Sequence, residues 1–454
     1  DVYISSYNIY MGHVLNAKGQ KLFPEDKILL THWNLRDEIK ANYNKGKEGL
    51  DKQRTVYEVM KRIISQEIPV QVINSGAYDW NPYTNTLTQN GQTATGTPEA
   101  TERYQRMLNN FHAMKAIDPY ADKNFIERKF SGEMEVSVED VKALFTQFLT
   151  SPELEAYDIW YDGFKPLSNL DEAKLDAQIQ KLYPNAEAFK AGLPSLLTHL
   201  GFTPERANEI CDKIAVDAAR GSGHAWGAAM KGQQSHLRTR IPAEGMNYKG
   251  YNIAVHEFGH NVEQTISIYN VDNFMMAGVP NTAFTEALAF VFQKRDLQLL
   301  GIENNDPEKD KMDILDKFWS LYEIMGVSML DISIWEWLYA NPNATAEQLK
   351  EASISLSKEI WNKYYAPVFG KKDETVLAVY SHMISYPLYL SAYAFGQIIE
   401  FQLEDYLNGK NFAQEVDRIY RLGRLTPNEW MIQATGNDLS VEPMIHALQK
   451  VIKK

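Results

Sequence analysis

His256-Glu257-Phe258-Gly259-His260 is an HExxH pattern in a stretch whose composition favours a helix. Two histidines four residues apart return to the same face of a helix, so both imidazoles can bind one metal ion. Glu257 would then lie beside a metal-bound water, where hydrolysis needs a general base. The pattern therefore predicts a zinc site formed by His256 and His260, with Glu257 as the catalytic base.

A third protein ligand is expected, because catalytic zinc takes three and leaves one position for water. Glu286 is the best candidate, since it is the one acidic residue in the apolar stretch 284–292. A carboxylate among apolar neighbours is costly unless it is paired or bound to a metal. The loop 275–281 contains Gly and Pro and would let a second helix turn back against the first. The alternative is that Glu286 caps or salt-bridges a helix. Glu263 is nearer in sequence but would point further round the helix, so we expect it to support the metal ligands from behind or to lie at the surface.

The composition limits the classes of partner. The chain has 454 residues, with 46 basic and 59 acidic side chains, and its net charge of −13 argues against nucleic acid and anionic membranes. A single cysteine, Cys211, excludes an internal disulfide. No apolar run has the length of a membrane span, and no signal region follows Asp1. We expect a soluble protein, cytoplasmic or exported with its leader removed; the oligomeric state stays open.

The chain is expected to be mainly helical. Apolar residues recur at three- and four-residue steps in several segments, as in amphipathic helices. These segments are 51–66, 98–116, 137–149, 170–183, 204–220, 310–325 and 345–365. Strands are expected at 68–74 and within 234–251, the latter as a small sheet beside the metal helix whose edge strand could hold an extended peptide. Residues 79–96, rich in Asn, Thr and Gly, predict an exposed loop or a lid.

A second group of candidate residues follows later in the chain. His382, Tyr386, Tyr389 and Tyr393 are spaced so that they would share one helix face, with Pro387 early in that helix or kinking it. Phenol and imidazole groups can donate hydrogen bonds to the oxyanion formed during peptide hydrolysis. We expect these side chains, Tyr389 among them, to contact the substrate and to donate to the oxyanion. The alternative is an aromatic stripe packed in the core.

The chain resembles the oligoendopeptidase F and thimet oligopeptidase group of zinc peptidases. The resemblance is carried by the HEFGH motif, by Glu286 in a downstream helical stretch and by the segment 386–394. Two upstream segments, 222–227 and 247–250, are also similar, and the likeness extends over roughly 157–407. The chain departs from the group at Glu263, where many relatives carry a further histidine.

The resemblance implies a bilobed helical metallopeptidase with a deep central cleft that admits short peptides. In such an enzyme His256, His260 and Glu286 would bind one Zn²⁺ per chain, and Glu257 would activate the water. His382, Tyr386 and Tyr393 would bind substrate and stabilise the oxyanion. We expect one metallopeptidase unit over 1–454, with approximate lobes 1–155 and 156–454.

Other readings remain open at the level of sequence. The motif does not encode the position of the cut, so a carboxypeptidase or dipeptidase on the same scaffold is an alternative to an oligopeptidase. A catalytically silent peptide-binding protein would keep the same fold. Another divalent ion can replace zinc, because availability decides which metal occupies such a site as much as ligand type does.

Overall fold

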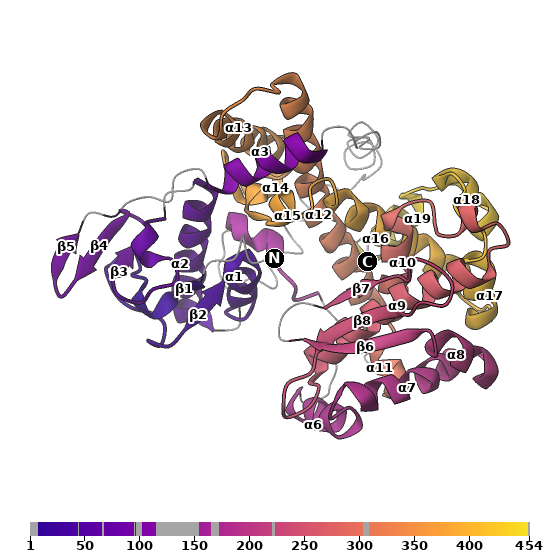
Figure 1. Cartoon of the computed structure of the whole chain (residues 1–454). Helices are drawn as coiled ribbons and strands as arrows, with labels where there is room; N and C mark the ends of the chain where they lie inside the picture. The colour runs from indigo at the N-terminus through magenta and orange to yellow at the C-terminus, as the bar shows by residue number, and fades with distance from the viewer. Residues whose placement is uncertain are drawn as a thin grey trace. The chain divides into compact units, whose positions relative to one another are not determined.

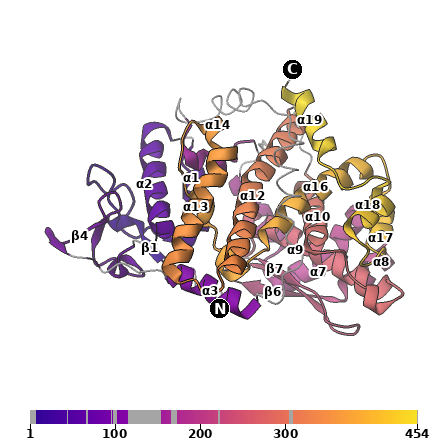
Figure 2. The same cartoon turned by 90° about the horizontal axis from the view of Figure 1, so that it is seen from above.

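The computed structural model describes residues 8–43, 45–65, 68–94, 96, 102–114, 154–164, 172–219, 223–302 and 308–452. Helices form most of this part of the chain (Figures 1 and 2), so the prediction of a mainly helical fold is confirmed. No helix within these ranges is both long and apolar enough to cross a membrane.

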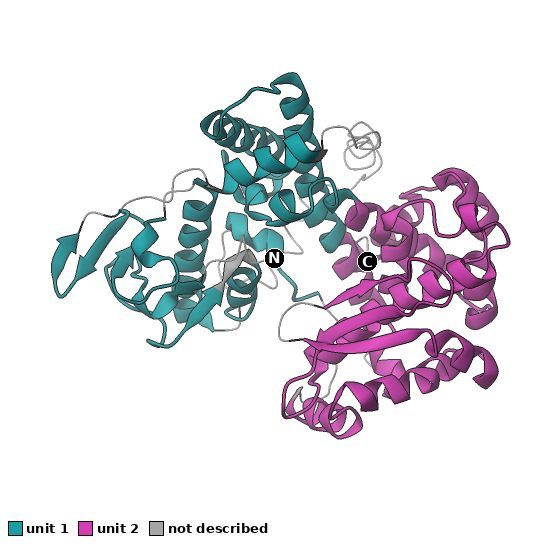
Figure 3. Ribbon diagram, viewed as in Figure 1, with its two compact units in different colours: residues 1–164, 319–391 teal, residues 165–318, 392–454 magenta. Residues whose placement is uncertain are grey.

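Contacts divide the chain into two compact units, which are coloured separately in Figure 3. Unit 1 comprises Asp1–Phe164 and Trp319–Ser391, and unit 2 comprises Lys165–Phe318 and Ala392–Lys454. The expected lobes 1–155 and 156–454 differ from these units, because 319–391 packs with the N-terminal part. The chain passes between the two units at three positions. The second, between Phe318 and Trp319, and the third, between Ser391 and Ala392, both fall within helices. The deep cleft stays a prediction.

Within the described residues, unit 1 is built from helices and two small antiparallel sheets. An ion pair joins α1 (Thr31–Lys40) to α12 (Lys309–Ala340), with Arg36 Nη2 2.5 Å from Glu323 Oε1. Its helices are α1 (Thr31–Lys40), α2 (Gly46–Ser65), α3 (Glu102–Met114), the C-terminal part of α12 (Lys309–Ala340), α13 (Ala346–Tyr364), α14 (Ala366–Phe369) and α15 (His382–Ser385). Its 3-10 helices are η2 (Met11–His13), η3 (Val70–Val72), η4 (Ala156–Trp160) and η6 (Val376–Val379). Strand β1 (Asn8–Tyr10) pairs with β2 (Ile28–Leu30).

Unit 2 contains the HExxH pattern on its longest complete helix, α9 (Tyr248–Asn270). Its other helices are α6 (Glu172–Leu182), α7 (Ala186–His199), α8 (Pro204–Cys211), η5 (Phe274–Met276), α10 (Thr282–Gln293), α11 (Asp296–Leu299), the N-terminal part of α12, α16 (Leu390–Leu407), α17 (Phe412–Ile419), α18 (Pro427–Thr435) and α19 (Glu442–Ile452). A three-stranded sheet has the order β6 (Ile214–Ala219), β8 (Ser235–Arg240), β7 (His224–Trp226). Strands β6 and β8 are parallel, and β7 is antiparallel to β8.

The structure confirms most of the expected helices and corrects one. Helices α2, α3, α6, α12 and α13 lie where helical periodicity predicts them. The expected helix at 204–220 ends at Cys211, and β6 follows from Ile214. Parallel pairing of Ile214–Ala219 with β8 overrides the helical pattern there. The expected helix at 137–149 lies outside the described residues.

Residues 79–96 are not an irregular loop. They contain an antiparallel three-stranded sheet of β3 (Asp79–Asn81), β4 (Thr86–Gln89) and β5 (Gln92–Ala94). Asn90 (φ 52°) and Gly91 (φ 78°) form the turn between β4 and β5. Asn-Gly with both residues at positive φ is a strong hairpin signal, which the overall polar composition obscures. In the stretch 68–74, where a strand is expected, Val70–Val72 forms the 3-10 helix η3, and Ile73 makes an isolated bridge to Ile9.

The predicted small sheet beside the metal helix is present in unit 2. Of the stretch 234–251, Ser235–Arg240 forms β8 and the last part begins α9. The sheet contacts α9 through Thr239, whose hydroxyl donates to Gly250 O at 2.8 Å. About three turns further along α9, Asn261 Nδ2 donates to His236 O at 3.2 Å. These bonds hold α9 against the sheet, with β7 at its edge.

Helices α9 and α10 approach each other closely at Gly259. A Cβ added to Gly259 would lie 2.7 Å from Ala289 Cα and 3.0 Å from Leu288 O, both on α10. Both helices begin at capping asparagines: Asn247 accepts from Gly250 N at 2.9 Å, and Asn281 accepts from Ala283 N at 3.0 Å. The glycine within the HExxH pattern is therefore what allows α10 to pack directly against the metal helix.

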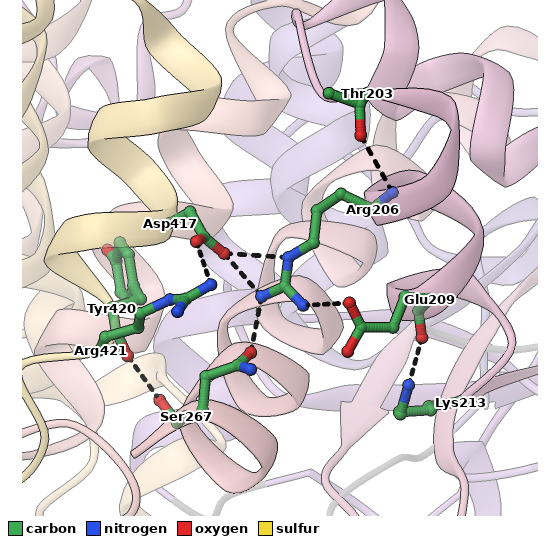
Figure 4. A network of polar contacts seen from close by, with 9 residues as sticks. Thr203, Arg206, Glu209, Lys213, Ser267, Asp417, Tyr420 and Arg421 are labelled. Atoms are coloured by element: carbon green, nitrogen blue, oxygen red, sulfur yellow. Dashed lines mark hydrogen bonds and ion pairs between the residues drawn. The ribbon is translucent and has the colours of Figure 1, made fainter. Parts of the chain in front are cut away.

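A partly buried polar network fixes the C-terminal end of α9 (Figure 4). Arg206 on α8 donates to Asp417 on α17 at 2.6 and 3.1 Å and to Asn270 at 2.6 Å. One turn earlier on α9, Ser267 Oγ lies 3.3 Å from Tyr420 O. Charged hydrogen bonds from one guanidinium to several elements restrict how α9 can shift along its axis.

Replacing Gly259 by Ala should destabilise unit 2, because the added methyl group meets backbone atoms of α10. Overpacking of this kind costs about 1–3 kcal/mol, more than the roughly 1 kcal/mol that Ala gains over Gly in helix propensity. Chemical denaturation measures the change. Gly192→Ala in α7 is the control, since the three atoms nearest to its added Cβ belong to the side chain of Tyr183 and not to backbone. Equal stability of Gly259→Ala and wild type would contradict the close packing.

Candidate metal centre

Unit 2 brings together the three residues predicted as metal ligands. His256 and His260 lie on α9, and Glu286 lies on α10. Glu286 Oε2 is 3.5 Å from His256 Nε2 and 3.8 Å from His260 Nε2. One ligand atom from each of the three residues lies within 4.8 Å of the other two. Two imidazole nitrogens and a carboxylate oxygen converging on one point are a donor set typical of zinc.

Helix geometry and packing explain this convergence. The two histidines are four residues apart on α9, and their rings are 4.9 Å apart at an interplanar angle of 85°. Glu286 is only 2% exposed. On the other side of α10, a Cβ added to Gly396 of α16 would lie 2.8 Å from Glu286 Cβ. Glu286 is therefore held between two helices that approach α10 through glycines.

A chain of hydrogen bonds orients His256. Its Nδ1 lies 3.1 Å from Gln293 Oε1, Gln293 Nε2 donates to Asn252 Oδ1 at 2.7 Å, and Asn252 Nδ2 donates to Asp296 Oδ2 at 2.7 Å. Because each amide donates onward, Gln293 Oε1 accepts the proton of His256 Nδ1. The Nε2 lone pair of His256 then points towards Glu286, as a metal ligand requires.

A second, shorter chain orients His260. Its Nδ1 lies 2.9 Å from Thr285 Oγ1, and the Thr285 hydroxyl donates to the Glu263 carboxylate. Since a hydroxyl has one proton, Thr285 must accept from His260 Nδ1. Ser267 Oγ also donates to Glu263, at 2.9 Å. Glu263 is buried, 3% exposed, and not at the surface; it lies at the end of a chain that leads to the metal ligand.

These supporting residues are largely missed by the sequence prediction, although their spacing carries a signal. Asn252 precedes His256 by four residues, so the two share a face of α9. Gln293 follows Glu286 by seven residues, two turns along α10. Polar residues at these steps from a metal ligand are candidates for orienting that ligand or a neighbouring one. Thr285, adjacent to Glu286, offers no such periodicity and depends on how the helices pack.

The electrostatics of the three residues favour a cation. Burial lowers the pKa of His260 to about 4, so this imidazole is neutral at physiological pH. Burial also acts to lower the pKa of His256, but the interaction with Glu286 outweighs it and the pKa is raised. A carboxylate that favours a positive charge on its neighbour also attracts a metal ion at the same point. Neutral imidazole at both histidines is the form that binds metal.

Glu257 faces the edge strand of the sheet. Its carboxylate accepts a hydrogen bond from the backbone N–H of Ala225 in β7. Gly223, just before this strand, leaves room for the Glu257 carboxylate, because a Cβ on residue 223 would lie 3.2 Å from Glu257 Oε1. Burial raises the pKa of Glu257 to about 7, and the charge of Glu286 adds to this effect. A carboxyl group that titrates near neutrality can both accept and return a proton.

Tyr393 lies on α16 in the same unit as the metal centre. It precedes Gly396, the point of contact with Glu286, by three residues and is half-buried. Residues three apart share a helix face, so Tyr393 lies one turn from the part of α16 that touches α10. This placement is compatible with the predicted oxyanion role, which stays a prediction.

His382, Tyr386 and Tyr389 belong to unit 1. The single helix expected to carry them with Tyr393 is not formed: α15 ends at Ser385, and α16 begins at Leu390. Pro387 explains the break, because the residue before proline disfavours the helical conformation, and Tyr386 has φ −143° and ψ 66°. The four side chains therefore do not form one helical stripe, and the predicted roles of these three stay predictions.

The buried Asp331 of α12 holds the chain between these two helices. Its carboxylate accepts from Leu388 N at 2.8 Å and from Leu390 N. Leu388 adopts φ 65°, unusual for a branched residue, and these bonds stabilise that conformation. The exposed Tyr386 and the neighbouring Tyr389 lie on this turn, with ring centroids 6.4 Å apart. His382 packs edge-on against Trp33, at 5.6 Å between centroids.

Comparisons with known proteins show the fold. No family model matches the sequence, and a search of curated proteins finds no match. A “putative peptidase from Chlamydophila abortus” aligns with 97% of this chain and 68% of its own, at 13% identity and a TM-score of 0.55. A structure titled “PZ peptidase A with inhibitor 2” aligns with 98% of this chain and 73% of its own, at 12% identity and a TM-score of 0.54.

A “putative oligoendopeptidase F” is similar to the same extent. It aligns with 92% of this chain and 69% of its own, at 13% identity and a TM-score of 0.52. Identities this low show a shared fold and nothing about substrate. The helical fold implied by the resemblance to the oligoendopeptidase F group is confirmed.

Replacing Thr285 by Val should weaken zinc binding about 10- to 100-fold, because it removes the group that orients His260 while keeping the side-chain volume. Competition with a fluorescent zinc chelator measures the affinity. Thr282→Val, one turn earlier on α10, is the matched control and should bind zinc like wild type. Identical affinities for all three proteins would show that the hydrogen bond from His260 to Thr285 is not needed.

Proposed function

We propose that this protein is a zinc-dependent peptidase that hydrolyses peptide bonds in short peptides. The observation that carries the proposal is the convergence of His256, His260 and Glu286 in unit 2, with Glu257 beside them. Structures with the same fold include proteins described as a peptidase, PZ peptidase A and oligoendopeptidase F, which supports peptide hydrolysis. The name oligoendopeptidase also favours short peptides as substrates.

The proposed ligands are suited to hold one zinc ion. His256 and His260 would each bind through Nε2, since their Nδ1 atoms are engaged by Gln293 and Thr285. Glu286 would supply a carboxylate oxygen. Bound zinc lowers the pKa of a coordinated water and polarises a carbonyl group. Three protein ligands are the number typical of catalytic zinc sites, in which water would complete the coordination.

Glu257 is the proposed general base. Its carboxylate takes a proton from the attacking water and passes it to the amine that leaves. The hydrogen bond from Ala225 N–H holds the carboxylate in place, and burial acts to raise its pKa, which makes it a stronger base. The edge strand β7 can align the substrate backbone by strand addition. Tyr393 is the proposed donor to the oxyanion from this unit.

Replacing Glu257 by Gln should lower kcat about 100-fold or more without loss of zinc, because Gln keeps the shape but cannot accept the proton. Hydrolysis of a quenched fluorescent peptide library and the zinc content of the same sample are the two measurements. Glu244→Gln, an exposed acid in the loop before α9, is the control. Near-normal turnover by Glu257→Gln would exclude it as the base.

Removing the metal should abolish cleavage reversibly. A chelator should take away about one zinc per chain and all peptidase activity, and zinc should restore both, with an increase in Tm because zinc binds only the folded state. Metal analysis and differential scanning calorimetry follow the cycle. Cleavage that persists in the metal-free protein would contradict the mechanism, whereas zinc binding without cleavage of any peptide would favour a peptide-binding protein.

The position of the cut distinguishes an oligopeptidase from a carboxypeptidase or dipeptidase. Mass spectrometry of products from peptides of graded length, with free and blocked ends, identifies it. Internal cuts in peptides blocked at both ends are the result expected for an oligopeptidase. Cleavage only next to a free end would favour the exopeptidase alternatives.

A further inference from the structure

A cavity of about 400 Å³ lies in unit 2 beside the candidate metal centre. Its wall includes residues from the end of the sheet, from α9, from the loop before α10 and from the first turn of α10. The residues that matter to its chemistry are Gly227, Glu263, Gln264, Gly278, Thr285 and Arg424. This volume is within the range of small-molecule sites in proteins.

The cavity shares three elements with the catalytic residues. Gly227 directly follows β7, whose Ala225 donates to Glu257. Gln264 is one turn of α9 beyond His260, about 6 Å along the helix axis. Thr285 immediately precedes Glu286 on α10. An extended peptide advances about 3.3 Å per residue, so the span from His260 to Gln264 corresponds to about two residues of a peptide lying beside β7.

Arg424 presents an open guanidinium to this cavity. Among the described residues its side chain makes no hydrogen bond or ion pair, although its main chain is fixed by a bond from Arg424 N to Met276 O at 2.9 Å. Gly278 has φ 119°, and a Cβ there would lie 2.6 Å from Arg424 Nε. The side chain thus lies against bare backbone, which positions it without occupying its donors.

Glu263, the acidic residue in the cavity wall, forms no hydrogen bond with Arg424. Glu263 accepts its hydrogen bonds from Ser267 and Thr285, and it interacts with Arg424 only through charge. Other parts of the wall are apolar or uncharged, including Ile268, Val279 and Pro280. A ligand that combines a short aliphatic part with a carboxylate would match this lining, because a guanidinium fork binds carboxylates with two parallel hydrogen bonds.

We infer that this cavity is a substrate subsite in which Arg424 binds a carboxylate of the peptide. The inference rests on the proposed peptidase function and adds a substrate preference to it. The carboxylate has two possible sources, an Asp or Glu side chain near the cleaved bond and the C-terminal carboxylate of a short peptide. Both present the same group to the guanidinium, and peptides can distinguish them.

The test uses matched peptides with the wild-type protein, Arg424→Gln and Arg424→Glu. One set replaces each position in turn by Glu or Gln, and a second set compares a free C-terminus with its amide. We expect one carboxylate peptide to be preferred over its neutral partner and Arg424→Gln to lower kcat/KM for it about 10- to 100-fold. The neutral partner should be cleaved equally by both proteins. Where the carboxylate belongs to a side chain, Arg424→Glu should prefer Lys at the same position.

Lys174→Gln is the control for the change in net charge, since Lys174 is an exposed cation on α6 of the same unit. It should cleave both peptides like wild type. A loss that is equal for the carboxylate and neutral peptides would show that Arg424 has a structural role and would overturn the inference. An unchanged preference in Arg424→Gln would overturn it as well.

Binding separates this inference from the proposed function. The same peptides are titrated by calorimetry into Glu257→Gln and into the double variant Glu257→Gln/Arg424→Gln. Weaker binding of only the carboxylate peptide by the double variant supports the subsite, even if the wild-type protein cleaves no peptide and the peptidase proposal fails. Equal binding of all peptides by both variants overturns the subsite whatever the activity.

Discussion

The contact between α9 and α10 at Gly259 is the constraint on which the candidate metal centre depends. Packed helices are usually 8–10 Å apart, at a distance set by the side chains between them. Here the absence of a Cβ lets α10 backbone approach the middle of the HExxH pattern. Glu286 is thereby brought to 3.5 and 3.8 Å from the two imidazoles. Gly396 allows α16 to press on the same glutamate from the other side.

Buried carboxylates linked to the two histidines are a second feature of unit 2. Each candidate ligand histidine is linked through neutral groups to a buried carboxylate: His256 to Asp296 through two amides, and His260 to Glu263 through Thr285. These chains fix which ring nitrogen carries the proton. They also provide the hydrogen bonds without which the buried acids would be strongly destabilising. The geometry and stability of the site therefore depend on residues of several helices and not on the three ligands alone.

Much of the site could be predicted because it depends on local periodicity. The two histidines lie on one helix, and the buried carboxylate of Glu286 lies in an apolar stretch, so both features appear in the sequence. Thr285 and Arg424 could not be predicted in this way. Thr285 meets His260 only because α10 crosses α9, and Arg424 meets the loop at Gly278 from a distant segment. Such contacts depend on tertiary packing.

The errors of the sequence prediction have physical causes as well. Pro387 ends the helix that spacing alone would extend from His382 to Tyr393. Pairing with β8 makes a strand of Ile214–Ala219 despite its helical pattern, and the Asn90-Gly91 turn makes a hairpin in a segment that composition marks as a loop. Periodicity predicted long helices well and failed where one turn residue or one pairing partner decides the structure.

X-ray absorption at the zinc edge of the purified protein tests the central claim most directly. The account predicts one zinc per chain, bound by two imidazole nitrogens and by oxygen at about 2.0–2.2 Å, with imidazole scattering reduced in His260→Ala. Sulfur ligation, oxygen ligation without imidazole, or a spectrum unchanged in His260→Ala would contradict the proposed ligands.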